Sequence, residues 1–144
     1  MSQVVLDDHL LRDVLTDTAP SALRQLLRTR QAATTNLFYL RLCRSVATAA
    51  GGQLTGSLPV EARQQLGRAL VALPDGIEIV PMRHLAYSMA VLVQRHGLSS
   101  LGAEAVAAAG FLGAPLCVSS NDDGPRIRAA ASAAGVAYRV VEPA

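Results

Sequence analysis

The chain has 144 residues, of which 51% are hydrophobic and only 3% aromatic, and its formal net charge is +2. A chain of roughly 150 residues can bury one sizeable core, so we expect residues 1–144 to form a single domain. This charge is too small to indicate a nucleic-acid-binding domain by itself, because such domains usually carry a dense basic face; it permits contact with a polyanion but does not imply it.

Short apolar runs and helical periodicity predict an alternation of strands and helices. Val4–Leu6 is typical of a buried strand, and it ends in Asp7 and Asp8. Three strands are expected after the first, at Ile77–Val80, Leu116–Val118 and Val136–Val141, together with an extended segment at Ala32–Thr35. In the first half of the chain we expect helices at His9–Leu15, from Pro20, from a cap at Asn36 and at Val60–Leu73. In the second half we expect helices from Met82 to His96, from Ser99 and from Pro125 to Ala134.

This alternation predicts the α/β class: a three-layer sandwich with a central parallel sheet of about four to five strands and helices on both faces. Ligands of such sheets bind at the carboxyl ends of the strands. Those ends carry Asp7, Asp8 and the loop Ser119–Asp123. One functional interpretation is therefore a small α/β module that binds an anionic ligand at the strand tips.

The opening MSQVVLDDHL lacks the pattern of a signal peptide, and no uncharged apolar run reaches about 18 residues. We therefore expect a cytoplasmic protein that does not contact a membrane.

Two segments carry a resemblance to a known family. VVLDDHLL and IVPMRHLAYSMAVLVQRHGLSSLGAEAVAAAGFLGAPLCVSS resemble the opening strand, the long helix, the Ala-rich helix and the following strand of the PIN-domain family. These are small metal-dependent nucleases, many of them toxins of toxin-antitoxin pairs. The resemblance implies three or four carboxylates around one or two Mg²⁺ or Mn²⁺ ions, which activate a water against a phosphodiester.

The chain departs from this acidic pattern at most of its positions. Asp7 matches the first acid and is the one candidate metal ligand that the resemblance retains. The other acids of the family match Arg41, Gly102 and Ser120, with Asp122 and Asp123 displaced by two or three positions from the last. Glu104 follows Gly102 by two residues, which places it about 200° around the helix, so we expect it to point elsewhere.

Arg41 brings a permanent cation to a position that the resemblance assigns to an acid. One hypothesis is that its guanidinium stands in place of the ion and pairs with Asp7. The alternative is that Arg41 extends to solvent and makes no such pair. For the acid pair, an alternative to metal binding is that Asp8 caps the following helix while Asp7 meets local backbone amides.

The sequence thus favours a degenerate PIN-like domain without metal-dependent nuclease activity, which acts as a binding or regulatory module. We expect no cofactor, and we expect a homodimer, an RNA or a small protein as the partner. The competing hypothesis is a Mg²⁺- or Mn²⁺-dependent endoribonuclease of the toxin-antitoxin type that uses Asp7, Asp8 and either Asp122 or Asp123. We assign His9, His84 and His96 to solvent-facing or helix-end positions because they lack metal-ligand spacing.

Overall fold

The computed structural model describes residues 2–48 and 52–143, and its strands form one five-stranded sheet in the order β3-β2-β1-β4-β5. The strands are β1 (Ser2–Leu6), β2 (Arg30–Thr34), β3 (Glu78–Ile79), β4 (Leu116–Ser119) and β5 (Tyr138–Val141). All four neighbouring pairs are parallel. The predicted α/β class is therefore confirmed, and the extended segment near Ala32 is a strand of the sheet.

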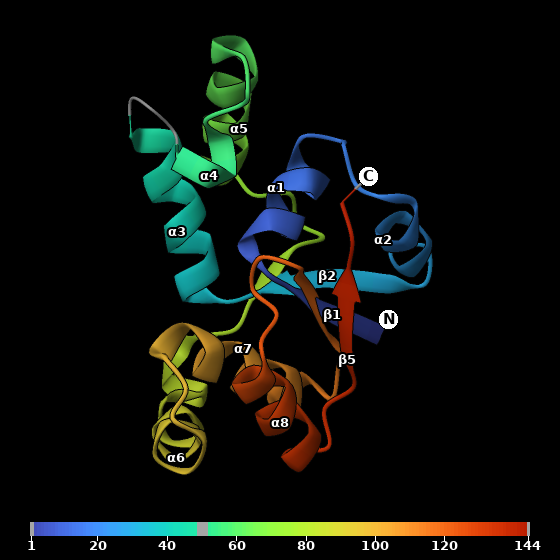
Figure 1. Cartoon of the computed structure of the whole chain (residues 1–144). Coiled ribbons are helices and arrows are strands. Elements are labelled where there is room, and N and C mark those ends of the chain that lie inside the picture. The colour runs from blue at the N-terminus through green and yellow to red at the C-terminus, as the bar shows by residue number, and fades with distance from the viewer. Residues whose placement is uncertain (1, 49–51, 144) are drawn as a thin grey trace.

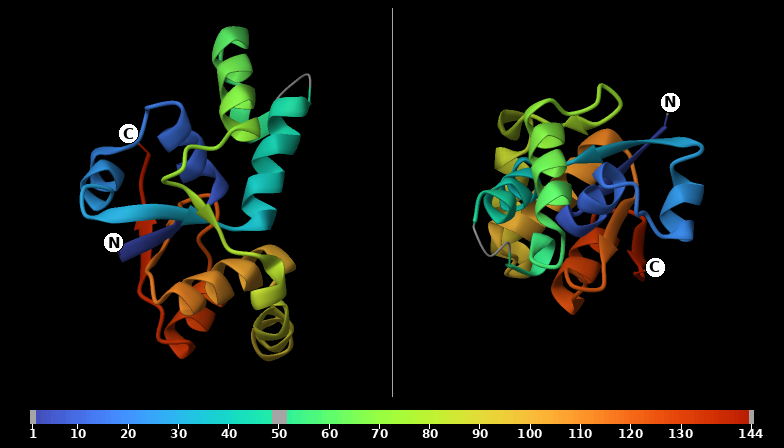
Figure 2. Two further views of the ribbon diagram at one scale, coloured as in Figure 1. Left: turned by 180° about the vertical axis from the view of Figure 1, so that it is seen from behind. Right: turned by 90° about the horizontal axis from the view of Figure 1, so that it is seen from above.

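Helices cover both faces of this sheet. They are α1 (Asp8–Leu15), α2 (Ser21–Leu26), α3 (Asn36–Ala47), α4 (Gly52–Thr55), α5 (Val60–Val71), the 3₁₀ turn η1 (Met82–His84), α6 (Ala86–His96), α7 (Ser100–Leu112) and α8 (Pro125–Ala133). In Figure 1 α6, α7 and α8 lie below the sheet, α1 and α2 lie above it, and α3, α4 and α5 extend away beside α1. Figure 2 shows the same layers from behind and from above. Within the described ranges, no helix is both long and apolar enough to cross a bilayer.

The central strand β1 is buried on both faces. Because successive side chains of a strand point to opposite faces, Val4 and Leu6 pack with Leu10 and Leu23 of the α1–α2 layer. Val5 packs with the opposite layer, which includes Val106 of α7. The continuous apolar run that predicted this strand is therefore the consequence of two helical layers.

The Ala-rich helix α7 packs closely against the sheet. Its buried residues include Ala103, Ala105, Ala108 and Ala109, all at most 1% exposed. Small side chains allow the helix backbone to approach the strands, so α7 supplies a thin but dense layer of contacts. The helix ends at Gly113, whose φ of 62° is the left-handed conformation that glycine adopts without a steric cost.

A buried carboxylate ties α7 to the start of α3. Glu104 of α7 is fully buried and accepts hydrogen bonds from the Asn36 backbone N (3.1 Å), Asn36 Nδ2 (2.7 Å) and the Leu37 backbone N (2.8 Å). A negative charge at this end of α3 also complements the helix dipole. The N-cap itself is Thr35, whose hydroxyl accepts from the Phe38 backbone N at 3.1 Å. The predicted cap at Asn36 is thus wrong by one residue, because Asn36 uses its side chain to reach the Val80 carbonyl and Glu104.

We expect Glu104→Ala to lower the free energy of unfolding by about 2 to 4 kcal/mol, because it leaves buried amide donors without an acceptor and opens a cavity. Glu104→Gln should cost less, since one side-chain oxygen remains as an acceptor. Urea denaturation measures both effects. The matched control is Glu61→Ala, on an exposed acid in the first turn of α5, which should change stability by less than about 0.5 kcal/mol. Equal losses for the Glu104 and Glu61 variants would contradict the anchoring role.

Candidate functional site

The predicted acidic residues gather where β1 and β4 end side by side. Leu6 of β1 pairs with Cys117 of β4, and the next amide, that of Asp7, donates to the Cys117 carbonyl at 3.2 Å. From β1 the chain continues to β2 on one side of the sheet, whereas β4 and β5 lie on the other. The site therefore lies at the switch point of the strand order, where α/β sheets most often bind ligands.

Asp7 is held by both neighbouring elements. Its Oδ1 accepts from the Leu10 backbone N at 2.9 Å, which makes Asp7 the N-cap of α1. Its Oδ2 accepts from the backbone N (2.7 Å) and the Oγ (2.8 Å) of Ser119 on β4. The prediction that Asp8 caps this helix is therefore wrong, whereas the expected contact of Asp7 with local amides is confirmed. Both oxygens of Asp7 are occupied by protein donors.

The guanidinium of Arg41 forms ion pairs with Asp8 and Asp122. Asp8 is fully buried, and its Oδ2 lies 3.1 Å from Arg41 Nε. Arg41 Nη1 lies 3.5 Å from Asp122 Oδ1. These contacts correct the hypothesis of an Arg41 pair with Asp7, because the partners are Asp8 and Asp122. The alternative holds only in part: the Arg41 side chain is 39% exposed, but it is not free of the acids. The reason is that Asp7 caps α1, so its two oxygens face α1 and β4. The next residue, Asp8, is therefore the one that contacts Arg41 on α3.

His9 is a member of the cluster that the sequence analysis did not identify. Its Nδ1 lies 3.1 Å from Asp8 Oδ1 and 3.5 Å from Asp122 Oδ2, and the residue is only 6% exposed. It occupies the first turn of α1 as a helix-end position, but the solvent-facing assignment is wrong. The available signal was its place directly after two acids at a strand tip. His84 stacks on Phe111 and His96 ends α6, both in the other helical layer.

The remaining predicted residues divide into one that joins the cluster and three that do not. Asp122 joins, whereas Asp123 turns away to accept from the Tyr138 hydroxyl at 2.7 Å and from Arg128 Nη2 at 2.7 Å. Ser120 is exposed. Gly102 lines a cavity of about 440 Å³ that Asp122 also borders, and contributes no side-chain ligand. Glu104 points to α3, as its helical position predicts.

Burial and mutual contacts shift the proton affinities in the cluster. Burial and the hydrogen bond with Asp122 raise the pKa of Asp7 to about 7. Burial alone would raise the pKa of Asp122, but its contacts with His9, Asp7 and Arg41 outweigh burial and hold that pKa well below its usual range. The contacts with Asp122 and Asp8 raise the pKa of His9 to about 9. Two basic side chains, His9 and Arg41, thus lie beside the carboxyl groups of Asp8 and Asp122.

The ligand atoms are close enough for a metal ion, but their partners oppose one. Ligand atoms of Asp7, Asp8, His9 and Asp122 all lie within 4.8 Å of one another. The Oδ2 atoms of Asp8 and Asp122 accept no aligned hydrogen bond, yet each faces a cation, Arg41 at 3.1 Å and His9 at 3.5 Å respectively. A protonated imidazole cannot ligate a metal. In this arrangement the residues do not fit Mg²⁺ or Mn²⁺ unless Arg41 moves away and His9 loses its proton.

Comparison with solved structures shows a similarity in fold. A chain of a solved structure described as "Toxin-antitoxin complex from Klebsiella pneumoniae" matches with a TM-score of 0.57 and 17% sequence identity, over 84% of this chain and 89% of that chain. No family model and no curated protein matches the sequence. The chain is therefore similar in fold to a component of a toxin-antitoxin complex, at an identity that shows the fold alone.

The cluster predicts how stability depends on pH. Because folded His9 keeps its proton up to about pH 9 whereas the unfolded side chain loses it near 6.5, the free energy of unfolding should fall as the pH rises between these values. Asp7 should add a decline from 3.8 to about 7, since its folded pKa is also raised. Urea denaturation across this range measures the slope. His9→Gln should flatten the upper part, and His84→Gln should not; an unchanged slope in the His9 variant would contradict this assignment.

Proposed function

We propose that this chain is a PIN-like domain of the toxin type that has lost metal-dependent nuclease activity and acts as a binding or regulatory module. One observation carries the proposal: Arg41 lies inside the acidic cluster, 3.1 Å from the fully buried Asp8. A guanidinium cannot lose its charge in a protein. It therefore supplies permanently the positive charge that a divalent ion would bring to these carboxylates.

Two further observations support this proposal. The position that the resemblance assigns to a third acid is Gly102, which has no side chain to offer. The fourth position is the exposed Ser120. Mg²⁺ and Mn²⁺ require several oxygen ligands, and Asp122 replaces only one of the missing acids. The fold likeness to a chain of a toxin-antitoxin complex supports a protein partner for such a module.

The second candidate is a metal-dependent ribonuclease that uses Asp7, Asp8 and Asp122. The proximity of these three ligand groups favours it. In that case RNA or metal binding would have to displace Arg41 from Asp8, at the cost of separating a buried ion pair. Asp123 has no part in either candidate because Arg128 and Tyr138 engage it.

Metal binding and RNA cleavage separate the two candidates. We expect the wild-type protein to leave single-stranded and structured RNA intact at millimolar Mn²⁺, and to leave the electron paramagnetic resonance signal of free Mn²⁺ unchanged. Arg41→Glu combined with His9→Gln should gain Mn²⁺ binding, since the double variant removes both cations from the cluster and adds a carboxylate. Arg83→Glu, on the exposed turn η1, is the matched charge reversal and should gain none. Cleavage by the wild type that disappears in Asp8→Ala would reject the proposal.

Removing the cation should also destabilise the fold. We expect Arg41→Ala to lower the free energy of unfolding by about 1 to 3 kcal/mol, because the buried Asp8 carboxylate loses its charged partner while the exposed part of Arg41 limits the loss. Arg83→Ala should change stability by less than about 0.5 kcal/mol. Chemical denaturation at neutral pH measures both. A loss for Arg41→Ala no greater than that for Arg83→Ala would show that the ion pair is weak and that the site is open to a metal.

A further inference from the structure

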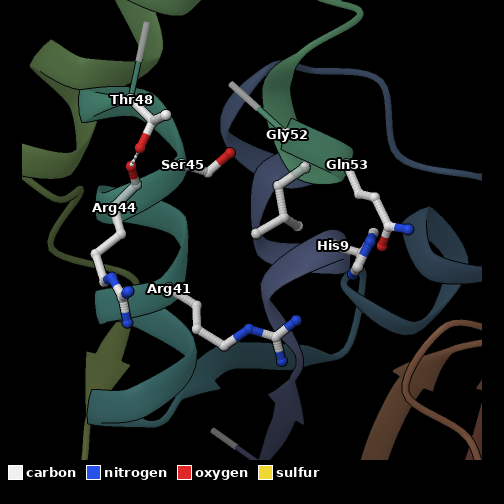
Figure 3. A pocket seen from close by; sticks show the side chains of 8 residues that line it. His9, Arg41, Arg44, Ser45, Thr48, Gly52 and Gln53 are labelled. Carbon is white, nitrogen blue, oxygen red and sulfur yellow. Dashed lines mark hydrogen bonds between the residues drawn. The ribbon is translucent and has the colours of Figure 1, made fainter. Parts of the chain in front are cut away.

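A second cavity lies on the α3 side of the acidic cluster. It has a volume of about 460 Å³ and is lined by His9, Arg41, Arg44, Ser45, Thr48, Gly52, Gln53 and Leu54. In Figure 3 Arg41 and Arg44 extend from α3 on one side, and His9 and Gln53 lie on the opposite side, on α1 and α4. The volume falls in the range of ordinary small-molecule sites, which is roughly 300 to 1,000 Å³.

The lining of this cavity is rich in cations and hydrogen-bond donors. Two guanidinium groups, one imidazole and one side-chain amide line it, and none of its described lining residues carries a carboxylate. Arg41 contacts the two acids through Nε, 3.1 Å from Asp8 Oδ2, and Nη1, 3.5 Å from Asp122 Oδ1, while its side chain stays 39% exposed. His9 turns Nδ1 to the same two acids, so the Nε2 edge of its ring faces the other way. The acids therefore orient both basic groups without occupying the cavity.

Arg44 carries a charge that the described part of the chain does not neutralise. It follows Arg41 by three residues on α3, so the two side chains share one helix face, where like charges repel each other. Arg44 forms no ion pair within the described residues, whereas Arg41 forms two. A bound anion would compensate the repulsion, and guanidinium groups match phosphate with paired N–H donors.

We propose that this cavity binds the phosphate monoester group of a small organic phosphate, with the phosphate between Arg44 and Arg41 and the organic part toward Gln53 and Leu54. The inference rests on the proposed function, because Arg41 keeps this position only while no divalent ion takes its place among the acids. The organic part follows from size: one phosphate group fills only a fraction of about 460 Å³. Binding is reversible and involves no bond cleavage.

Isothermal titration calorimetry of the full chain tests the site. The probes are the four ribonucleoside 5′-monophosphates, ribose 5-phosphate, inorganic phosphate, the matching nucleosides and citrate. We expect at least one organic phosphate to bind more tightly than inorganic phosphate, and the nucleosides and citrate not to bind. Arg44→Gln should raise the Kd about tenfold or more, because a charged hydrogen bond is lost. Arg83→Gln, the matched exposed arginine outside the cavity, should leave the Kd within about twofold.

Each outcome has one meaning for the proposal. Tight binding that Arg44→Gln weakens and Arg83→Gln does not, with unchanged melting temperatures for both variants, supports it. Absence of binding by every phosphate, binding of citrate as tight as that of phosphates, or an unchanged Kd in Arg44→Gln overturns it. If no phosphate binds while Mn²⁺ still fails to bind the wild type, the phosphate site is rejected and the proposed function stands. If Mn²⁺ binds and RNA is cleaved, the proposed function is rejected, whatever the phosphates do.

Discussion

The contact between Arg41 and the fully buried Asp8 is the ion pair around which the acidic cluster is arranged. Arg41 supplies a positive charge to the Asp8 carboxylate, which is buried away from solvent. A second contact, with Asp122, holds the guanidinium at the point where the strand order reverses. His9, on α1, contacts the same two acids. A buried ion pair of this kind adds little net stability over an apolar alternative, but removing one partner is costly. The arrangement therefore gives Asp8 a fixed partner whose removal would leave a buried charge uncompensated.

Most of the fold could be predicted from the sequence because local signals and tertiary packing agree. The apolar run at Val4–Leu6 is a strand buried by two helical layers, and the alternation of elements predicts the parallel sheet. Errors arose where a choice depends on distant contacts. Thr35 rather than Asn36 caps α3, because Glu104, 68 residues away, takes the Asn36 amide. Sequence spacing alone contains no information about such a partner.

The sequence predicts which residues gather at the candidate site, but not which of them contact one another. Asp7, Asp8, Arg41 and Asp122 were all identified as candidates, and the structure brings them together. Their pairing depends on which oxygen faces which element, and Ser119 decides this by drawing Asp7 toward β4. Metal-ligand spacing along the sequence does not indicate His9, because one of its partners, Asp122, follows a different strand. Adjacent acids at a strand end are a reason to examine the next residue also.

The position of β1 in the sheet has a consequence for synthesis of the protein. This strand pairs with β2 on one side, but its other partner, β4, begins at Leu116. While the chain emerges from the ribosome, the edge of β1 that β4 will cover stays open until Leu116–Ser119 has been translated. Such late pairing slows folding and leaves an apolar edge available for misassembly. A chaperone that holds nascent chains would therefore find its binding segment in β1.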